Sequence, residues 1–213
     1  LSFGRGGCGK LGHGDEVLQY APWPIEALSG VRVVAIAAGD EHSMVLTDDG
    51  KVLTFGHGYD GKLGHGYGVE HQNNQFVPMV IEELDGMVVV AIAAGSYHSL
   101  VLTDGGDVLS FGTRWTGQLG HGAAGPEDLH KPEVIKALSS VRVVAIAAGS
   151  IHSMVLTDEG KVLSFGQGGD GRLGHGDEEP HFQYWPKVIK ALCGTRVVAI
   201  AAGHNHSMVL TDG

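Results

Sequence analysis

The sequence contains few cysteines, few aromatic residues and no long apolar segment. Only two of its 213 residues are cysteines, and Phe, Trp and Tyr together make up 7%. Cys8 and Cys193 have no matching partners in the repeats described below, which favours free thiols in a reducing compartment over a disulfide framework. No apolar run approaches the length needed to cross a bilayer. We therefore expect no membrane insertion and an intracellular protein of the cytoplasm or nucleus.

Positive charge is also scarce. The chain has 14 Lys and Arg against 24 Asp and Glu, a net charge of −10. Binding to a phosphate backbone requires clustered Lys and Arg, so we expect no nucleic-acid partner. No signal peptide is visible, but the chain opens at Leu1 inside a repeat. We therefore expect the native N-terminus to be missing, and the compartment cannot be decided from targeting signals.

The chain consists of four copies of one unit of about 54 residues. The segment VVAIAAG begins at Val33, Val89, Val143 and Val197, and each copy is followed by a His-Ser pair and an apolar run. FG and LGHG recur in the same order, at spacings of 52 to 56 residues. Periods of this length are typical of solenoids and propellers.

The stretch AGDEHSMVLTDDG raises the possibility of an active site, because Asp40, Glu41 and His42 are adjacent. The repeats argue against it. The carboxylates are absent from the other three copies, whereas the histidine recurs as His98, His152 and His206. We interpret the four histidines as structural, satisfying polar groups where one strand ends and the next begins. Hydrolysis through the Asp40, Glu41 and His42 group stays open as a minor alternative to a protein that is not an enzyme.

The pattern within a unit is β. RVVAIAAG is typical of a strand buried on both faces, HSMVLTD of a second strand, and VLTFG or VLSFG of a third. An Asp or Gly pair between the second and third indicates a hairpin. PMVIEEL, PEVIKAL and PKVIKAL predict a fourth, outer edge strand beginning at proline. Since no segment shows a helical period, we expect an all-β propeller of four-stranded antiparallel blades.

The glycine-rich segments invite two other interpretations. A phosphate-binding loop requires a GxxxxGK[ST] pattern or a strand–glycine–helix order, and neither is present among the 35 glycines. The LGHG histidines suggest metal binding. Because one occurs per blade, they would be spread around a ring, whereas metal ligands must lie about 2 Å from one ion. We predict a structural role for these residues, and no metal site or cofactor: His13, His65, His121 and His175.

The compound motif GKVLTFGHGYDGKLGHG followed by VVAIAAGSYHSLVLTDGG closely resembles the repeat of the regulator of chromosome condensation family. The resemblance covers essentially the whole chain. It implies a propeller, usually of seven blades, that acts as a recognition scaffold. Family roles include nucleotide exchange on a Ran-type GTPase, ultraviolet sensing in plants, substrate docking in ubiquitin ligases, and inhibition.

Departures from the family pattern narrow these roles. The chain lacks the basic tail and the wedge-like insertion of the exchange factor, and it lacks the Gly-Trp-Arg-His-Thr motifs of the plant photoreceptor. Fold alone does not decide function. We expect a non-catalytic protein–protein interaction scaffold. The alternative, implied by the resemblance, is a guanine-nucleotide exchange factor for a small GTPase.

The two ends of the chain read as two halves of one blade. Gly213 followed by Leu1 would recreate most of TDGKVLSFG. We predict a single repeat domain over residues 1–213, with blade units at 1–30 joined with 197–213, 31–86, 87–140 and 141–196. A four-blade ring, an eight-blade ring of two chains and part of a seven-blade ring are all open. Self-association or further repeats are expected to close the ring.

Binding residues should differ between copies while the frame recurs. The most divergent positions are the pair after each AAG, the segment after each FG, and the long loop after each LGHG. From the first two sets we predict partner contacts at Asp40, Glu41, Tyr59, Tyr97, Arg114, Trp115, Ile151, His204 and Asn205. An unconstrained loop also diverges, so these residues need a structural test.

Overall fold

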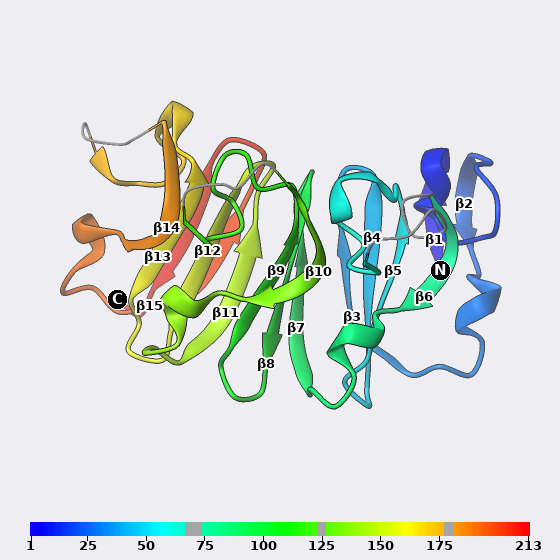
Figure 1. Cartoon of the computed structure of the whole chain (residues 1–213), viewed down its shortest axis with the longest axis horizontal. Helices are drawn as coiled ribbons and strands as arrows, with labels where there is room; N and C mark the ends of the chain where they lie inside the picture. Colours follow the sequence, from blue (N-terminus) through cyan, green and yellow to red (C-terminus); the bar gives the residue numbers. More distant parts are fainter. Residues whose placement is uncertain (67–73, 123–126, 177–180) are drawn as a thin grey trace.

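The structure is a computed structural model that describes residues 1–66, 74–122, 127–176 and 181–213. It contains three antiparallel sheets of four strands and two sheets of two strands, with short 3₁₀ turns and no α-helix among the described residues. The sheets stand side by side along a curved row (Figure 1). The all-β propeller predicted from the repeats is confirmed, as a sector of a ring.

Each four-stranded sheet is an up-and-down meander in chain order. The sheets comprise β3 (Val33–Ala38), β4 (His42–Thr47), β5 (Val52–Gly56) and β6 (Gln75–Val80); β7 (Val89–Ala94), β8 (His98–Thr103), β9 (Val108–Gly112) and β10 (Leu129–Val134); β11 (Val143–Ala148), β12 (His152–Thr157), β13 (Val162–Gln167) and β14 (Phe182–Val188). Gly50, Gly106 and Gly160 provide the positive φ that the second hairpin of each sheet requires.

The two remaining sheets lie at opposite ends of the row (Figure 1). One pairs β1 (Ser2–Gly4) with β2 (Gln19–Trp23), which are equivalent to the two outer strands of a blade. The other pairs β15 (Val197–Ala202) with β16 (Ser207–Thr211), which are equivalent to the two inner strands. The chain is therefore an open arc in this structure, and the union of the two halves into one blade stays a prediction.

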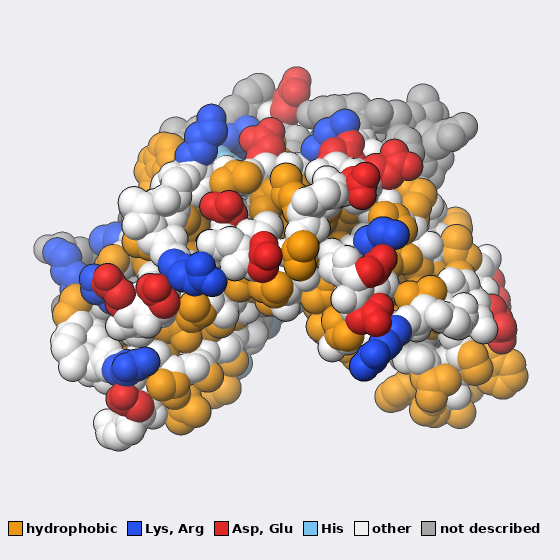
Figure 2. All heavy atoms as spheres, turned by 90° about the horizontal axis from the view of Figure 1, so that it is seen from below, with side chains coloured by type: hydrophobic (Ala, Val, Ile, Leu, Met, Phe, Trp, Pro, Cys, Tyr) orange, Lys and Arg blue, Asp and Glu red, His pale blue; other side chains and the backbone are white. Residues whose placement is uncertain are grey.

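The core lies between neighbouring blades. β4, β8 and β12 are almost wholly buried, as are β5, β9 and most of β13, because a blade covers each face. Phe111, for example, packs in one cluster with Met44 and Leu46 of the preceding blade. At the end of the arc the equivalent Met208 and Leu210 of β16 are exposed. Figure 2 shows hydrophobic side chains gathered at both ends of the arc.

Two details of the strand prediction are wrong. The VVAIAA strands are only partly buried, since the second valine, for example Val90, is exposed. These strands are the innermost of their blades and have no further strand beyond them. The outer strand also begins earlier than predicted, so that Pro78 lies within β6. The following Ile-Glu-Glu-Leu segment turns away instead, and Glu82–Leu84 forms a 3₁₀ turn, η4, because Ile81 and Leu84 are drawn into the core.

Candidate functional site: the loop rim and its histidine network

The repeated His-Ser pairs form a hydrogen-bonded chain from blade to blade. The Nε2 atom of His42 lies 2.8 Å from Oγ of Ser99 in the next blade. The same contact joins His98 to Ser153 and His152 to Ser207, each at 2.9 Å. The partner is therefore a serine of the following blade, whereas the sequence suggested local backbone groups. Three successive blade interfaces thus share one polar contact.

The direction of these hydrogen bonds fixes the histidine tautomer. Ser99 Oγ donates to the backbone carbonyl of Lys62, and Ser153 and Ser207 donate to the equivalent carbonyls of Gln118 and Arg172. Because each hydroxyl proton is used in this way, the ring must donate from Nε2. The opposite nitrogen, Nδ1, is left buried without a hydrogen-bond partner in all three histidines of the chain.

A neutral ring is the only form that these positions favour. Burial lowers the pKa of His42 and of His98 to about 3, and that of His152 to about 4. A charged imidazolium would carry a proton on an Nδ1 that has no acceptor. These rings are therefore neutral and inaccessible at neutral pH, which removes them as candidates for acid–base catalysis.

The LGHG histidines make a second contact, within each blade. The Thr54 hydroxyl donates to the carbonyl of Leu63 at 2.7 Å, and His65 Nε2 lies 2.9 Å from the same oxygen. The equivalent serine and histidine pairs are Ser2 with His13, Ser110 with His121, and Ser164 with His175. Each contact ties the loop after the third strand to its own blade.

The residues that follow AAG converge near the axis of the arc. Asp40, Ser96, Ser150 and His204 line one hollow of about 210 Å³ together with the adjoining Ala and Gly residues of all four repeats. Ser96 Oγ donates to Ser150 Oγ at 3.0 Å. Residues more than 160 positions apart in the sequence thus meet at one place, as the divergence of these positions suggested.

Exposed aromatic side chains lie on the loops at the same edge of the blades. Tyr59 and Trp115 occupy equivalent positions, three residues after FG, and are 55% and 65% exposed, while Tyr97 is 47% exposed. Backbone hydrogen bonds join the two kinds of loop, since Thr113 N donates to the Tyr97 carbonyl at 2.9 Å. We call Tyr59, Tyr97 and Trp115 the aromatic rim.

The other predicted contact residues are distributed unevenly. Asn205 is exposed, Ile151 is half-buried, and Arg114 is partly buried, with a Nε atom that has no hydrogen-bond partner in the structure. His204 lies at the axial hollow, apart from the aromatic rim. The loops after LGHG fall partly at 67–73, 123–126 and 177–180, outside the described residues.

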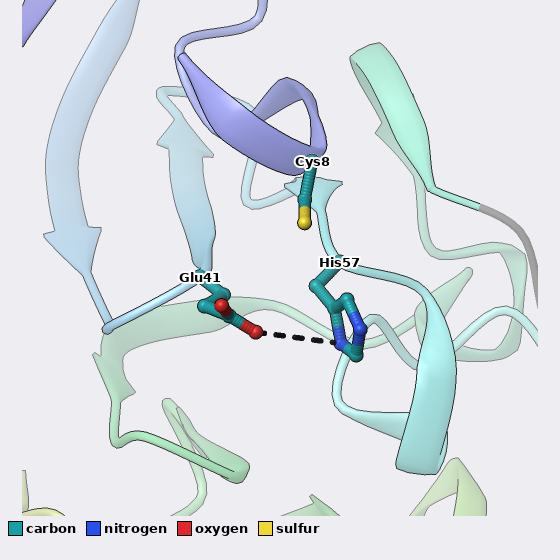
Figure 3. A group of neighbouring side chains, drawn as sticks. All are labelled: Cys8, Glu41 and His57. Carbon is teal, nitrogen blue, oxygen red and sulfur yellow. Dashed lines mark ion pairs between the residues drawn. The ribbon is translucent and has the colours of Figure 1, made fainter. Parts of the chain in front are cut away.

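Sequence reasoning missed a polar cluster beside the aromatic rim. Cys8, Glu41 and His57 come from three segments and point toward one another (Figure 3). Glu41 Oε2 lies 3.8 Å from His57 Nδ1, and Lys62 Nζ lies 2.7 Å from the same nitrogen. Burial, and then Lys62, lowers the pKa of His57, so the neutral ring accepts a hydrogen bond from Lys62. Aligning each FG segment with the next repeat's AAG loop would have found this cluster.

Lys62 itself is buried, with 1% of its surface exposed. Its Nζ lies 3.5 Å from Asp60 and 5.8 Å from the centre of the Tyr97 ring. Burial lowers the pKa of this ammonium group. The equivalent Arg172 is also buried and donates to Asp170 at 2.9 Å. Buried cations thus lie directly beneath the loops that carry the divergent residues.

Comparison with known proteins agrees with this architecture. The sequence profile described as "Regulator of chromosome condensation (RCC1) repeat" matches residues 1–46, 49–102, 105–156 and 159–210. Structurally, the chain is similar to Prp20p from Saccharomyces cerevisiae, with a TM-score of 0.84 and 26% identity over 98% of this chain and 50% of that one. In the described residues no helix is long and apolar enough to span a membrane.

Two curated relatives show the same relationship in sequence. The chain is 39% identical to the E3 ubiquitin-protein ligase HERC2 of Homo sapiens over 99% of its length, but it spans only 4% of that protein. It is 33% identical to the ultraviolet-B receptor UVR8 of Arabidopsis thaliana over 99% of its length, and it spans 46% of that receptor. With four matched repeats that together cover nearly every residue, the chain belongs to the family of regulator of chromosome condensation (RCC1) repeat proteins.

Proposed function

We propose that the chain is a non-catalytic scaffold that binds another protein through the aromatic rim. The observation that carries this proposal is the exposure of Tyr59 and Trp115 at equivalent positions of neighbouring blades, with Tyr97 beside them. Aromatic residues are enriched at the centres of interfaces, where they supply large contact area at low entropic cost. The net charge of −10 favours a partner surface that carries Lys and Arg.

The polar residues of the repeats support a scaffold over an enzyme. The buried histidines spend their Nε2 protons on serines of the next blade, and the serines spend theirs on backbone carbonyls. We propose that the eight repeated histidines are structural, as their recurrence in every copy suggests. The divergent side chains, rather than these histidines, are then the ones available to a partner.

Replacing Trp115 or Tyr97 with alanine should reduce partner capture at least tenfold, because each change removes contact area without disturbing the core. The test is affinity capture with the wild-type chain and each variant, followed by quantitative mass spectrometry. Tyr20→Ala is the matched control, since Tyr20 is 95% exposed on the outer strand β2 and lies outside the aromatic rim. Equal capture by all four chains would contradict this binding surface.

Guanine-nucleotide exchange is the second candidate. It is favoured by the structural similarity to Prp20p, which was described together with its binding to Gsp1p and histones. The test is release of a fluorescent guanine nucleotide from a panel of small GTPases in the presence of the chain. Release at the background rate for every GTPase would remove this candidate and leave the scaffold proposal intact.

A further inference from the structure

We propose that Cys8, Glu41 and His57 form a binding site for a zinc-like divalent cation. Cys8 lies in the 3₁₀ turn η1 (Gly7–Gly9), Glu41 between β3 and β4, and His57 directly after β5. Their ligand atoms all lie within 4.8 Å of one another and face a common point (Figure 3). A thiolate, an imidazole and a carboxylate are the ligand types that Zn²⁺ prefers, and three protein ligands leave a fourth position for water.

The backbone already holds the three residues in place. Cys8 has a φ of 62°, a left-handed conformation that non-glycine residues rarely adopt, and its N–H donates to Glu16 at 2.8 Å. The His57 N–H donates to the carbonyl of Glu41, also at 2.8 Å. Small side-chain rotations are therefore enough to bring the ligand atoms to the separations of a tetrahedral site.

The scaffold itself does not need these three side chains. The same backbone arrangement recurs at the next two blade interfaces, where Thr113 N donates to Tyr97 O and Gln167 N donates to Ile151 O. The residues equivalent to Cys8, Glu41 and His57 are Asp60, Tyr97 and Thr113 at one interface, and Thr116, Ile151 and Gln167 at the other. Those interfaces pack well without a ligand set. The convergence of three metal-binding side chains is specific to the first interface and needs its own explanation.

Lys62 is the group that competes with the metal. In the metal-free structure its Nζ donates to His57 Nδ1, the nitrogen that a cation would take. When the cation binds, Lys62 would keep Asp60 and the Tyr97 ring as partners. The Cys8 thiol releases one proton to solvent, so the thiolate and the Glu41 carboxylate neutralise the two charges of the cation. Affinity should therefore rise with pH and should rise further when Lys62 is removed.

The test is titration of the full chain with Zn²⁺ in competition with a chelating dye, and with Co²⁺ to detect the absorption band of a thiolate ligand. We expect one high-affinity site with that band. Cys8→Ser and His57→Gln should each lower the affinity at least tenfold. Lys62→Met, which keeps the length of the side chain, should raise it severalfold.

Cys193→Ser is the matched control, because Cys193 is the other free cysteine and is exposed in a different repeat. It should leave the affinity and the Co²⁺ spectrum unchanged. Binding that survives Cys8→Ser at wild-type affinity, or a Co²⁺ complex without the thiolate band, would show adventitious binding by other surface residues and overturn the proposal. Circular dichroism of each variant checks that the chain remains folded. Partner capture by the aromatic rim is measured separately, so failure of one proposal does not decide the other.

Discussion

Replacing His98 with alanine should lower the free energy of unfolding by about 2–4 kcal/mol. The imidazole is completely buried, and it supplies the only bond that joins β8 to Ser153 of the next blade through a side chain. Its removal deletes this hydrogen bond and leaves a cavity between the second and third complete blades. Denaturant unfolding at pH 7.5, followed by tryptophan fluorescence, measures the change.

The chain contains its own control for this experiment. His206 is equivalent to His98 in the repeat, but it is exposed at the end of the arc. His206→Ala should therefore change the free energy of unfolding by less than about 0.5 kcal/mol. His98→Gln should lie between wild type and His98→Ala, because its amide can still donate to Ser153. If His98→Ala and His206→Ala were equally stable, the histidine network would have no energetic role.

Lowering the pH from 7.5 to 5 should destabilise the chain by about 6 kcal/mol, or about 2 kcal/mol for each of His42, His98 and His152. In the unfolded chain a histidine takes up a proton near pH 6.5, whereas the buried rings have pKa values of about 3, 3 and 4. The unfolded state therefore binds more protons across this range. The stability conferred by the neutral rings is complete above pH 6.5 and is lost as the pH falls toward 3.

This loss is comparable with the whole stability of a typical domain, about 5–15 kcal/mol. We therefore expect acid unfolding well above the range in which carboxylates titrate. The measurement is the denaturant midpoint at pH 7.5, 6 and 5. His98→Gln should reduce the dependence on pH by about a third, since one of three rings is removed, whereas His206→Gln should not alter it. Equal midpoints at pH 7.5 and 5 would refute the assignment of buried neutral rings.

The repeat pattern carried most of the fold prediction. VVAIAAG, HSMVLTD and VLSFG each became a strand in every complete blade, in the order expected, because alternating short apolar runs and glycine turns are local features. The outer strand was the least accurate. Its end depends on where Ile81 and Leu84 meet the core, which is a tertiary contact that no local pattern contains.

The candidate site was predictable only in part. Divergence between repeats identified Tyr59, Tyr97 and Trp115, which the structure places on adjoining loops. It also identified Glu41, but not the approach of Cys8 and His57, since these residues belong to different blades. The burial of Lys62 was not predicted either, because lysines are almost always exposed unless they are paired.

By itself, the sequence determined that the chain is built of four like β units, which residues recur in every unit, and which differ. These are properties of spacing and composition, and they need no knowledge of how the units meet. Only the tertiary structure decided which side chains face each other across two blades: the histidine with the next blade's serine, and Cys8 with Glu41 and His57. Such contacts depend on the rotation of one sheet against the next, and residues as far apart as His98 and Ser153 come within 2.9 Å only once the sheets have packed.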